Sequence, residues 1–448
     1  MASKSTPNRC GLPAARHVRR GMATLVVVMV LFFIVALVAA YTSRNLIFEQ
    51  RTSANQYRGT QAFEAAEAGL EWALTMLNSG RIDATCQAHS DPATTDRSFR
   101  ERYLNIDVAS GEVSARVRSN GQALRPACVF DGSSWRCSCP LDAAPTLTQP
   151  AGAGPAPAFV LRFSGNTPAY PSVSGPYPPG VIRIESTGCT RLDTAAGCAS
   201  STASGDGRAT VTILAALKSA VTTAPAAAVT VHRELQGIGP KLIAFANQGS
   251  ANGVSVHTGT PSNLDPAWAT FHGPPGTPGD RTVINGDTLL NGLSPQRMFA
   301  SVFGMGHDTY RLQPAAVWVD CAVDCSAAAV RDKALLNPGR VLWIKGDFDF
   351  SIADEIGSAA SPVVMVIDGN VSVSNANARL NGLVYVVGDN WSSFGDLTLR
   401  GALIAESNLV LMGDAATENT ILHDPAVLQL LNRSSGSFVR VPGSWRDF

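Results

Sequence analysis

The sequence predicts an α+β protein in which one long N-terminal helix precedes a β-rich region. Three observations support this fold class. An uncharged, mostly apolar run extends from Met22 to Tyr41. A helical pattern continues from there to residue 78, and no proline interrupts the chain between Pro13 and Pro92. After residue 105, short segments of alternating apolar and polar residues are separated by stretches rich in glycine and proline, which is typical of strands joined by turns.

The apolar run is long enough to cross a membrane, because its 20 residues would extend roughly 30 Å as a helix. A secretory signal peptide would be cleaved at a small-residue site such as 38–40, and a plain signal anchor would be retained. A third interpretation is a type IV prepilin leader, residues 1–21, which a dedicated peptidase removes after Gly21. We favour the third, because Gly21 follows two arginines and directly precedes the apolar run. The mature chain would then begin at Met22.

The second half of the predicted helix is amphipathic. Its apolar residues recur at three- and four-residue steps and form one face. These residues are Phe63, Ala66, Leu70, Leu74 and Leu77. Such a face must cover another element, and a β-sheet is the expected partner. Together with Val26 in the membrane segment, these are the positions that we expect to take part in helix packing.

The cysteines indicate an exported, disulfide-bonded protein. Cleavage after Gly21 would remove Cys10 and leave an even set, which is typical of an oxidising compartment such as the periplasm. Local spacing favours the pairs Cys189–Cys198 and Cys321–Cys325. The pairing of the remaining four cysteines is only partly determined. We expect Cys137 and Cys139 each to bond either Cys86 or Cys128. A zinc site is the alternative, but the sequence has no CxxC pair to support it.

Composition divides the chain into four parts. The leader is followed by the long helix at 22–80, whose membrane-spanning part is 22–41. We predict an α+β head with Pro- and Gly-rich loops at 81–220, and a β-rich C-terminal domain at 221–448. An alanine-rich stretch near residue 220 marks the predicted boundary between the last two.

The C-terminal domain contains an approximate repeat over residues 341–412. Four apolar segments each end in a turn, and the turns recur at nearly constant intervals; they begin at Gly346, Gly369, Gly388 and Ser407. Repeating units of about 20 residues made only of strands and turns indicate a β-solenoid, in which each coil is stabilised by stacking on the next. A meandering antiparallel sheet is the alternative. Residues 244–247 and Asp287 indicate earlier coils, and 421–431 indicates a helix that caps an open edge.

The sequence contains little catalytic chemistry. It has no HExxH, GxSxG or phosphate-binding loop motif, and its 35 basic and 35 acidic residues indicate no binding of nucleic acid. The acids Asp347, Asp349, Asp354 and Glu355 form a cluster that fits a solvated strand face better than a calcium loop. Likewise, Glu64, Glu67 and Glu71 fit a solvated helix face. We therefore expect no enzyme activity, no metal and no cofactor.

At its N-terminus the chain resembles the PilX-type minor pilins of the type IV pilus system. The resemblance is carried by Arg20–Met22 with its apolar run, by Glu49–Arg51, by Asn55 and by Gln61–Leu70. It is specific over about residues 15–78, and Met298–Met305 supports it further along the chain. It implies a long helix on a pilin-like antiparallel sheet, an inner-membrane location with the bulk of the chain in the periplasm, and later a place on the pilus.

One departure from the family concerns the mechanism of assembly. Major pilins carry a glutamate at the fifth mature residue, which pairs with the N-terminal amine of a neighbouring subunit. The corresponding residue here is Val26. The resemblance then implies a non-catalytic minor pilin that initiates assembly or sits at the fibre tip. Its implied partners are other minor pilins, the inner-membrane assembly platform, the prepilin peptidase and a large tip adhesin, with roles in adhesion and twitching motility.

Two other functions remain open from the sequence. A tip pseudopilin of a type II secretion system also lacks the glutamate. A membrane-anchored β-solenoid that binds or hydrolyses carbohydrate would use paired acids such as Asp347 and Asp349 in a groove.

Overall fold

A computed structural model describes residues 20–151, 155–165, 177–192, 197–198, 207–238, 242–249, 253–265, 267–375, 377–413 and 418–447. The chain forms two compact units, Met1–Arg58 and Gly59–Phe448. Helix α1 (Arg20–Leu77) begins in the first unit and ends in the second. Most of the predicted leader, and Cys10 with it, lies outside the described residues.

In the first unit, α1 exposes its apolar side chains all around the helix. Every large apolar residue from Leu25 to Tyr41 is between 50% and 73% exposed. The first charged residue after this stretch is Arg44, which lies over the ring of Phe48. Among the described residues, α1 is the one helix whose length and composition would let it cross a membrane.

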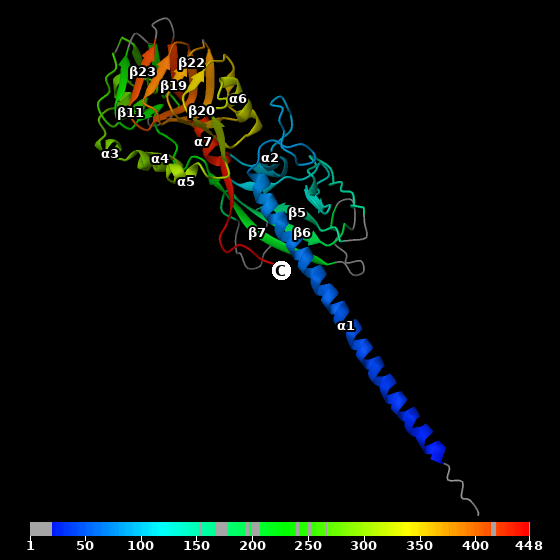
Figure 1. The fold of residues 1–448 in the computed structure, drawn as a ribbon. Helices are drawn as coiled ribbons and strands as arrows, with labels where there is room; N and C mark the ends of the chain where they lie inside the picture. The colour runs from blue at the N-terminus through cyan, green and yellow to red at the C-terminus, as the bar shows by residue number, and fades with distance from the viewer. Residues whose placement is uncertain are drawn as a thin grey trace, which may run out of the picture. The chain divides into compact units, whose positions relative to one another are not determined.

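In the second unit, an antiparallel sheet packs against the last turns of α1 (Figure 1). Its strand order is β25–β7–β6–β5–β3–β4. The strands are β3 (Ala127–Phe130), β4 (Trp135–Ser138), β5 (Ala158–Ser164), β6 (Val181–Cys189), β7 (Arg208–Ser219) and β25 (Gly436–Arg440). The core between helix and sheet contains the buried side chains of Leu70, Phe159, Ile184 and Ile213.

A short helix and a hairpin complete this layer. Helix α2 (Phe99–Tyr103) begins with a capping box, in which the side chains of Ser98 and Glu101 each bond the other's backbone N–H. Strands β1 (Leu104–Ile106) and β2 (Val113–Ala115) follow and pair antiparallel.

The rest of the second unit is a β-solenoid of parallel strands. Strands β20 and β22 each bend, at Gly382 and Gly401, so their two halves belong to different sides of the solenoid. Thus β22 pairs with β24 through residues 397–401 and with β8 through residues 403–405. The coils of the C-terminal repeat are built from β14 (Ala316–Asp320), β15 (Val341–Lys345), β16 (Phe348–Phe350), β17 (Glu355–Ile356), β18 (Val363–Asp368), β19 (Val371–Val373), β20 (Ala378–Val386), β21 (Asn390–Ser393), β22 (Leu397–Ala405), β23 (Leu409–Gly413) and β24 (Glu418–His423).

The predicted repeat corresponds to real coils. Lys345 pairs with Asp368, and Gly382 pairs with Gly401, so each residue lies beside its counterpart one repeat later in the chain. The predicted solenoid is therefore confirmed. The antiparallel alternative is wrong, since these strands pair in parallel throughout their described residues. Stacking the coils buries a continuous apolar interior that includes Phe348, Leu380 and Trp391.

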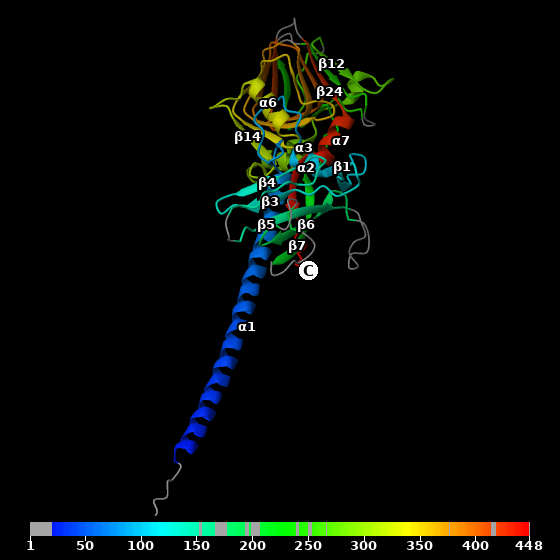
Figure 2. The ribbon, with the colours of Figure 1, turned by 90° about the vertical axis from the view of Figure 1, so that its right-hand side faces the viewer.

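The earlier segments join the same stack, but at its far end. Strand β9 pairs with β23, and β10 pairs with β24, so residues 229–284 stack on the last coil of the repeat. Figure 2 shows β14 near one end of the stack and β12 near the other. Residues 244–247, predicted to mark a further coil, do belong to the solenoid through β10, which stacks on the last coil of the repeat. These strands are β8 (Val229–Val231), β9 (Leu235–Ile238), β10 (Leu242–Ala246), β11 (Val256–Thr258), β12 (Ala269–His272) and β13 (Val283–Ile284).

Helices cover the solenoid at one end and on one flank. Helix α6 (Ala327–Leu336) places Ala327, Val330 and Ala334 against the interior and caps the end next to β15. Outward-facing residues of the strands, such as Trp343 and Tyr385, are covered by other helices. These are α4 (Pro295–Phe303), α5 (His307–Tyr310) and α7 (Pro425–Ser434), with α3 (Thr288–Asn291) and the 3-10 turn η1 (Gly279–Thr282) nearby in the chain. Of the helix predicted at 421–431, the part from Pro425 exists as α7, but it covers a flank and not an edge. The prediction was wrong for 421–423, which belong to strand β24.

The predicted α+β fold class is confirmed: a long helix, an antiparallel sheet against it, and a solenoid. The predicted boundaries at residues 80 and 220 stay a prediction. The structure adds that the chain returns to the antiparallel sheet after the solenoid, since β25 pairs with β7.

Candidate functional site

The first part of the candidate site is the apolar half of α1. Gly21 and Met22 lie in its first turn, and predicted cleavage between them stays a prediction. Val26 is 58% exposed and makes no side-chain contact that would bury it within this chain. Because apolar side chains in water are unfavourable, a surface of this length requires lipid or other apolar helices around it.

The other predicted packing residues lie on the sheet side of α1. Ala66, Leu70 and Leu77 are buried, while Phe63 and Leu74 are half-buried against the same core. The prediction missed the small residues of this face, which are Ala62, Ala65, Gly69 and Ala73. Their spacing was visible in the sequence, but alanine and glycine carry little weight in an apolar pattern.

Small residues allow an unusually close approach between helix and sheet. A Cβ added to Gly188 in β6 would lie 2.1 Å from the carbonyl oxygen of Ala62 and 2.5 Å from the backbone nitrogen of Ala66. On the helix side, a Cβ added to Gly69 would lie 2.3 Å from Ser186 Oγ. The backbone of α1 therefore rests almost directly on β6, and glycine is required at the contact.

The C-terminal segment fastens this half of α1 to the sheet. Asn78 exchanges two hydrogen bonds with the backbone of Phe438. Arg440 forms an ion pair with Glu71, and the Trp445 indole donates to Glu67 at 2.7 Å. Two of the three acids that we predicted to form a solvated helix face, Glu67 and Glu71, therefore contact the C-terminal segment. Sequence reasoning missed this because their partners lie in the last residues of the chain.

Arg100 ties this segment to the solenoid. Its side chain is 3% exposed and donates to four carbonyl oxygens, those of Leu77, Gly339, Ser434 and Gly436. Burial and, secondly, the charge of Arg340 lower the pKa of Arg100 to about 10, so it remains a cation at neutral pH.

The structure pairs all eight cysteines of the predicted set. Cys128 and Cys137 lie opposite each other on β3 and β4. Cys86–Cys139 joins the segment after α1 to the end of β4. The two locally spaced pairs, Cys189–Cys198 and Cys321–Cys325, are also bonded. No thiolate of these eight is left for a metal, and no group of three metal-ligating side chains occurs in the part of the chain that the structure describes.

The acidic cluster of the solenoid connects neighbouring coils. Asp347 Oδ1 accepts from the backbone N–H of Asn370 at 2.7 Å, and Asp349 Oδ2 accepts from Ser374 Oγ at 2.5 Å. Asp354 forms an ion pair with Arg331, and Glu355 accepts from Asn381. These contacts give the acids a role in joining neighbouring coils to one another and to helix α6.

A helix with an apolar, exposed half and a second half packed on an antiparallel sheet is the arrangement that the resemblance to pilins implies, and its apolar half fits anchoring in a membrane. Residues 20–71 match the family described as PilX N-terminal. This match confirms the resemblance to PilX-type pilins over that segment.

Similarity to proteins beyond that family is low. The competence-associated pilin ComZ from Thermus thermophilus, a crystal structure, aligns at 10% identity over 87% of this chain and 98% of its own, with a TM-score of 0.18. No curated protein matches the sequence.

Proposed function

We propose that this protein is a non-catalytic minor pilin that acts in the initiation of pilus assembly or at the fibre tip. The observation that carries the proposal is the exposed apolar half of α1, from Leu25 to Tyr41, within a segment that matches PilX N-terminal sequences. Such a helix would be held in the inner membrane before assembly and would pack among helices of other minor pilins afterwards. In lipid, that packing would rest on van der Waals contact and small residues.

Val26 supports a terminal position in the fibre. A carboxylate at this depth would cost several kcal/mol in lipid unless it were paired. With valine, the helix has no such charge to satisfy and offers no partner for a subunit above it. A subunit of this kind fits where the stack of helices begins or ends.

The bulk of the second unit supports the same position. Residues 229–423 add a whole solenoid to the pilin-like layer. A domain of that size, repeated along a thin fibre, would obstruct lateral packing, whereas one copy at an end would not. The solenoid would then face outward from the fibre end, where it would contact a large tip adhesin or a surface.

The first test locates the mature N-terminus of the membrane-bound protein by mass spectrometry. We expect it at Met22. A Gly21→Leu variant should remain unprocessed, and Gly11→Leu, which alters a glycine in the leader, should be processed normally. A mature chain that begins near Tyr41 would contradict the proposal, because the apolar helix would have been discarded.

The second test identifies neighbours of the helix by site-specific photocrosslinking. A photoreactive residue at Leu31, which is 56% exposed, should crosslink to other minor pilins. The matched control is Leu289, which is 83% exposed on α3 of the second unit and should not. Deletion of the gene should remove surface fibres and twitching. Persistence of fibres with loss of exoprotein secretion would instead assign the protein to a type II secretion pseudopilus.

A further inference from the structure

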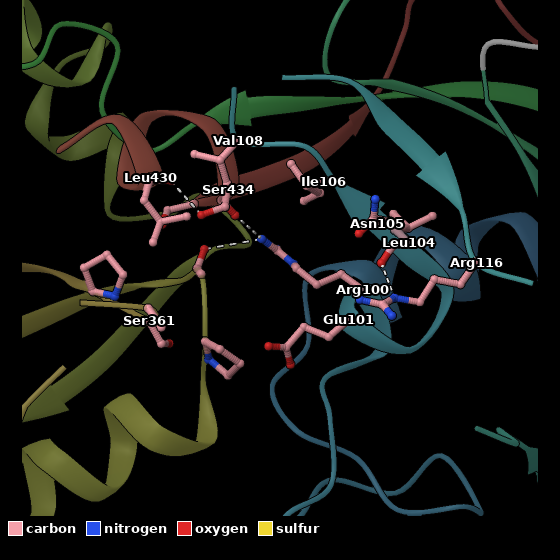
Figure 3. Close-up of a pocket in the computed structure, with 15 residues that line it drawn as sticks. Arg100, Glu101, Leu104, Asn105, Ile106, Val108, Arg116, Ser361, Leu430 and Ser434 are labelled. Carbon is pink, nitrogen blue, oxygen red and sulfur yellow. Dashed lines mark hydrogen bonds between the residues drawn. The ribbon is translucent and has the colours of Figure 1, made fainter. Parts of the chain in front are cut away.

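A cavity of about 330 Å³ lies in the second unit, where the β1–β2 layer, the solenoid loops and the end of α7 come together. Figure 3 shows Arg100, Glu101, Ser361 and Leu430 around it, with Arg116 beside Leu104. The volume lies at the lower end of the range for pockets that bind small molecules. The lining combines charged and hydroxyl groups with apolar side chains.

The cavity is lined by a buried cation, Arg100, which lies over the ring of Phe438 and is influenced by the charge of Glu101 without forming an ion pair with it. Arg100 donates to carbonyl oxygens alone, and two of these bonds, to Gly339 and Ser434, are long at 3.3 and 3.5 Å. A guanidinium has five N–H groups, and the four bonds to carbonyls leave one without a partner among the described residues. No carboxylate of the described residues forms an ion pair with Arg100.

The neighbouring charges are also predominantly positive. Arg116 uses Nε to bond Leu104 O at 2.9 Å, and its two terminal nitrogens bond no other described residue. Arg340 lies close enough to lower the pKa of Arg100, and among the described residues its side chain bonds only Asn337 and Pro314. The one acid in the lining is Glu101, whose Oε2 accepts from both the backbone N–H and the hydroxyl of Ser98.

Neutral polar groups flank these cations. The side chains of Asn105 and Ser361 line the cavity and bond no other described residue, so they are available for hydroxyl groups of a ligand. Leu104, Ile106 and Leu430 provide an apolar wall on which a carbon ring could rest. A guanidinium binds a carboxylate through two parallel hydrogen bonds, which gives geometry as well as charge.

We propose that this cavity binds a small carboxylate that carries hydroxyl groups, of the sugar-acid class. The carboxylate would lie against Arg116 and the free donor of Arg100, and the hydroxyls would meet Asn105, Ser361 and the open oxygen of Glu101. This inference does not rest on the role of the protein in a pilus.

The test is isothermal titration calorimetry of the full-length protein in detergent with D-galacturonate, and with D-galactose as the neutral match. We expect galacturonate to bind and galactose to bind at least about tenfold more weakly, because a hydrogen bond to a charged group contributes more than a neutral one. Acetate, a carboxylate without hydroxyl groups, is titrated in the same way. The proposal would be overturned if both sugars bound equally, if neither bound, or if galacturonate and acetate bound equally.

Charge variants with opposite expected signs separate a site from a surface effect. Arg116→Gln should weaken galacturonate binding about tenfold. Glu101→Gln should strengthen galacturonate binding, since it removes a negative charge that repels the carboxylate of the ligand. Glutamine can still complete the capping box of α2. Arg125→Gln, an exposed arginine outside the lining, changes the net charge equally and should leave binding unaltered. The same loss in Arg125→Gln as in Arg116→Gln, or no change in either lining variant, would contradict the assignment.

Discussion

Asn78 and Phe438, separated by 360 positions in the chain, exchange two hydrogen bonds of 2.9 and 2.7 Å. The Asn78 amide donates to the Phe438 carbonyl, and its oxygen accepts from the Phe438 N–H. Asn78 follows α1, and Phe438 lies in β25, so this contact joins the end of the helix to the last strand. Both residues are buried, so if the amide were removed, water would not replace it as the hydrogen-bond partner of the N–H and C=O groups of Phe438.

We expect Asn78→Ala to lower the free energy of unfolding by about 2–4 kcal/mol, because two buried backbone groups lose their partners. The measurement is denaturant unfolding of the full-length protein in detergent, followed by tryptophan fluorescence. Asn105→Ala, at an exposed amide with no side-chain bond among the described residues, should change stability by less than about 0.5 kcal/mol. Equal effects of the two substitutions would show that the Asn78 contact contributes nothing.

The contact between α1 and β6 should not tolerate a side chain at Gly188. Because the added Cβ would meet backbone atoms of Ala62 and Ala66, which cannot rotate away, we expect Gly188→Ala to cost about 1–3 kcal/mol. Gly59→Ala is the matched control on the helix: nothing lies within 4 Å of its added Cβ. It should stabilise the helix by up to about 1 kcal/mol. A neutral Gly188→Ala variant in the same unfolding assay would contradict the close approach.

The bend in β22 should depend on glycine for two separable reasons. Gly401 has φ +137°, and an added Cβ would lie 1.8 Å from the carbonyl oxygen of Gly382 in the neighbouring coil. We expect Gly401→Ala to cost about 3 kcal/mol or more. Gly276→Ala is the control for backbone strain without close packing, since Gly276 has φ +86° and no atom lies within 4 Å of its added Cβ. It should cost about 1 kcal/mol. Thermal unfolding measured by circular dichroism compares the two, and equal losses would rule out stacking as the cause.

Glu406 should make the solenoid less stable as pH rises. This carboxyl group is 8% exposed after β22, and burial raises its pKa above the ordinary value of 4.5, against smaller opposing effects of Tyr385 and His307. The folded state therefore holds the proton more tightly than the unfolded state does. The resulting stability is fully present below pH 4.5 and is lost as pH rises through the raised pKa.

Glu406→Gln should remove this pH dependence and raise the melting temperature at pH 7 more than at pH 4. The control is Glu418→Gln, at an exposed glutamate in β24, which should alter neither value. If Glu406→Gln instead lowers stability at pH 7, the fold stabilises the ionised carboxylate and the predicted sign is wrong.

The sequence alone determined the local features. The uncharged run from Met22 to Tyr41, the steps between Phe63 and Leu77, and the regular recurrence of turns after residue 345 are patterns of near neighbours. They predicted the helix and the coils correctly, because helix periodicity and coil length follow from backbone geometry.

Only the tertiary structure decided how distant segments meet. It placed residues 229–284 beyond the last coil of the repeat, returned β25 to the first sheet, and surrounded Arg100 with carbonyl groups from separate segments. No periodic signal records such contacts, because their energy comes from burying and satisfying groups that are far apart in the chain. The same holds for Glu67 and Glu71, whose partners are met only once the C-terminal segment lies along α1.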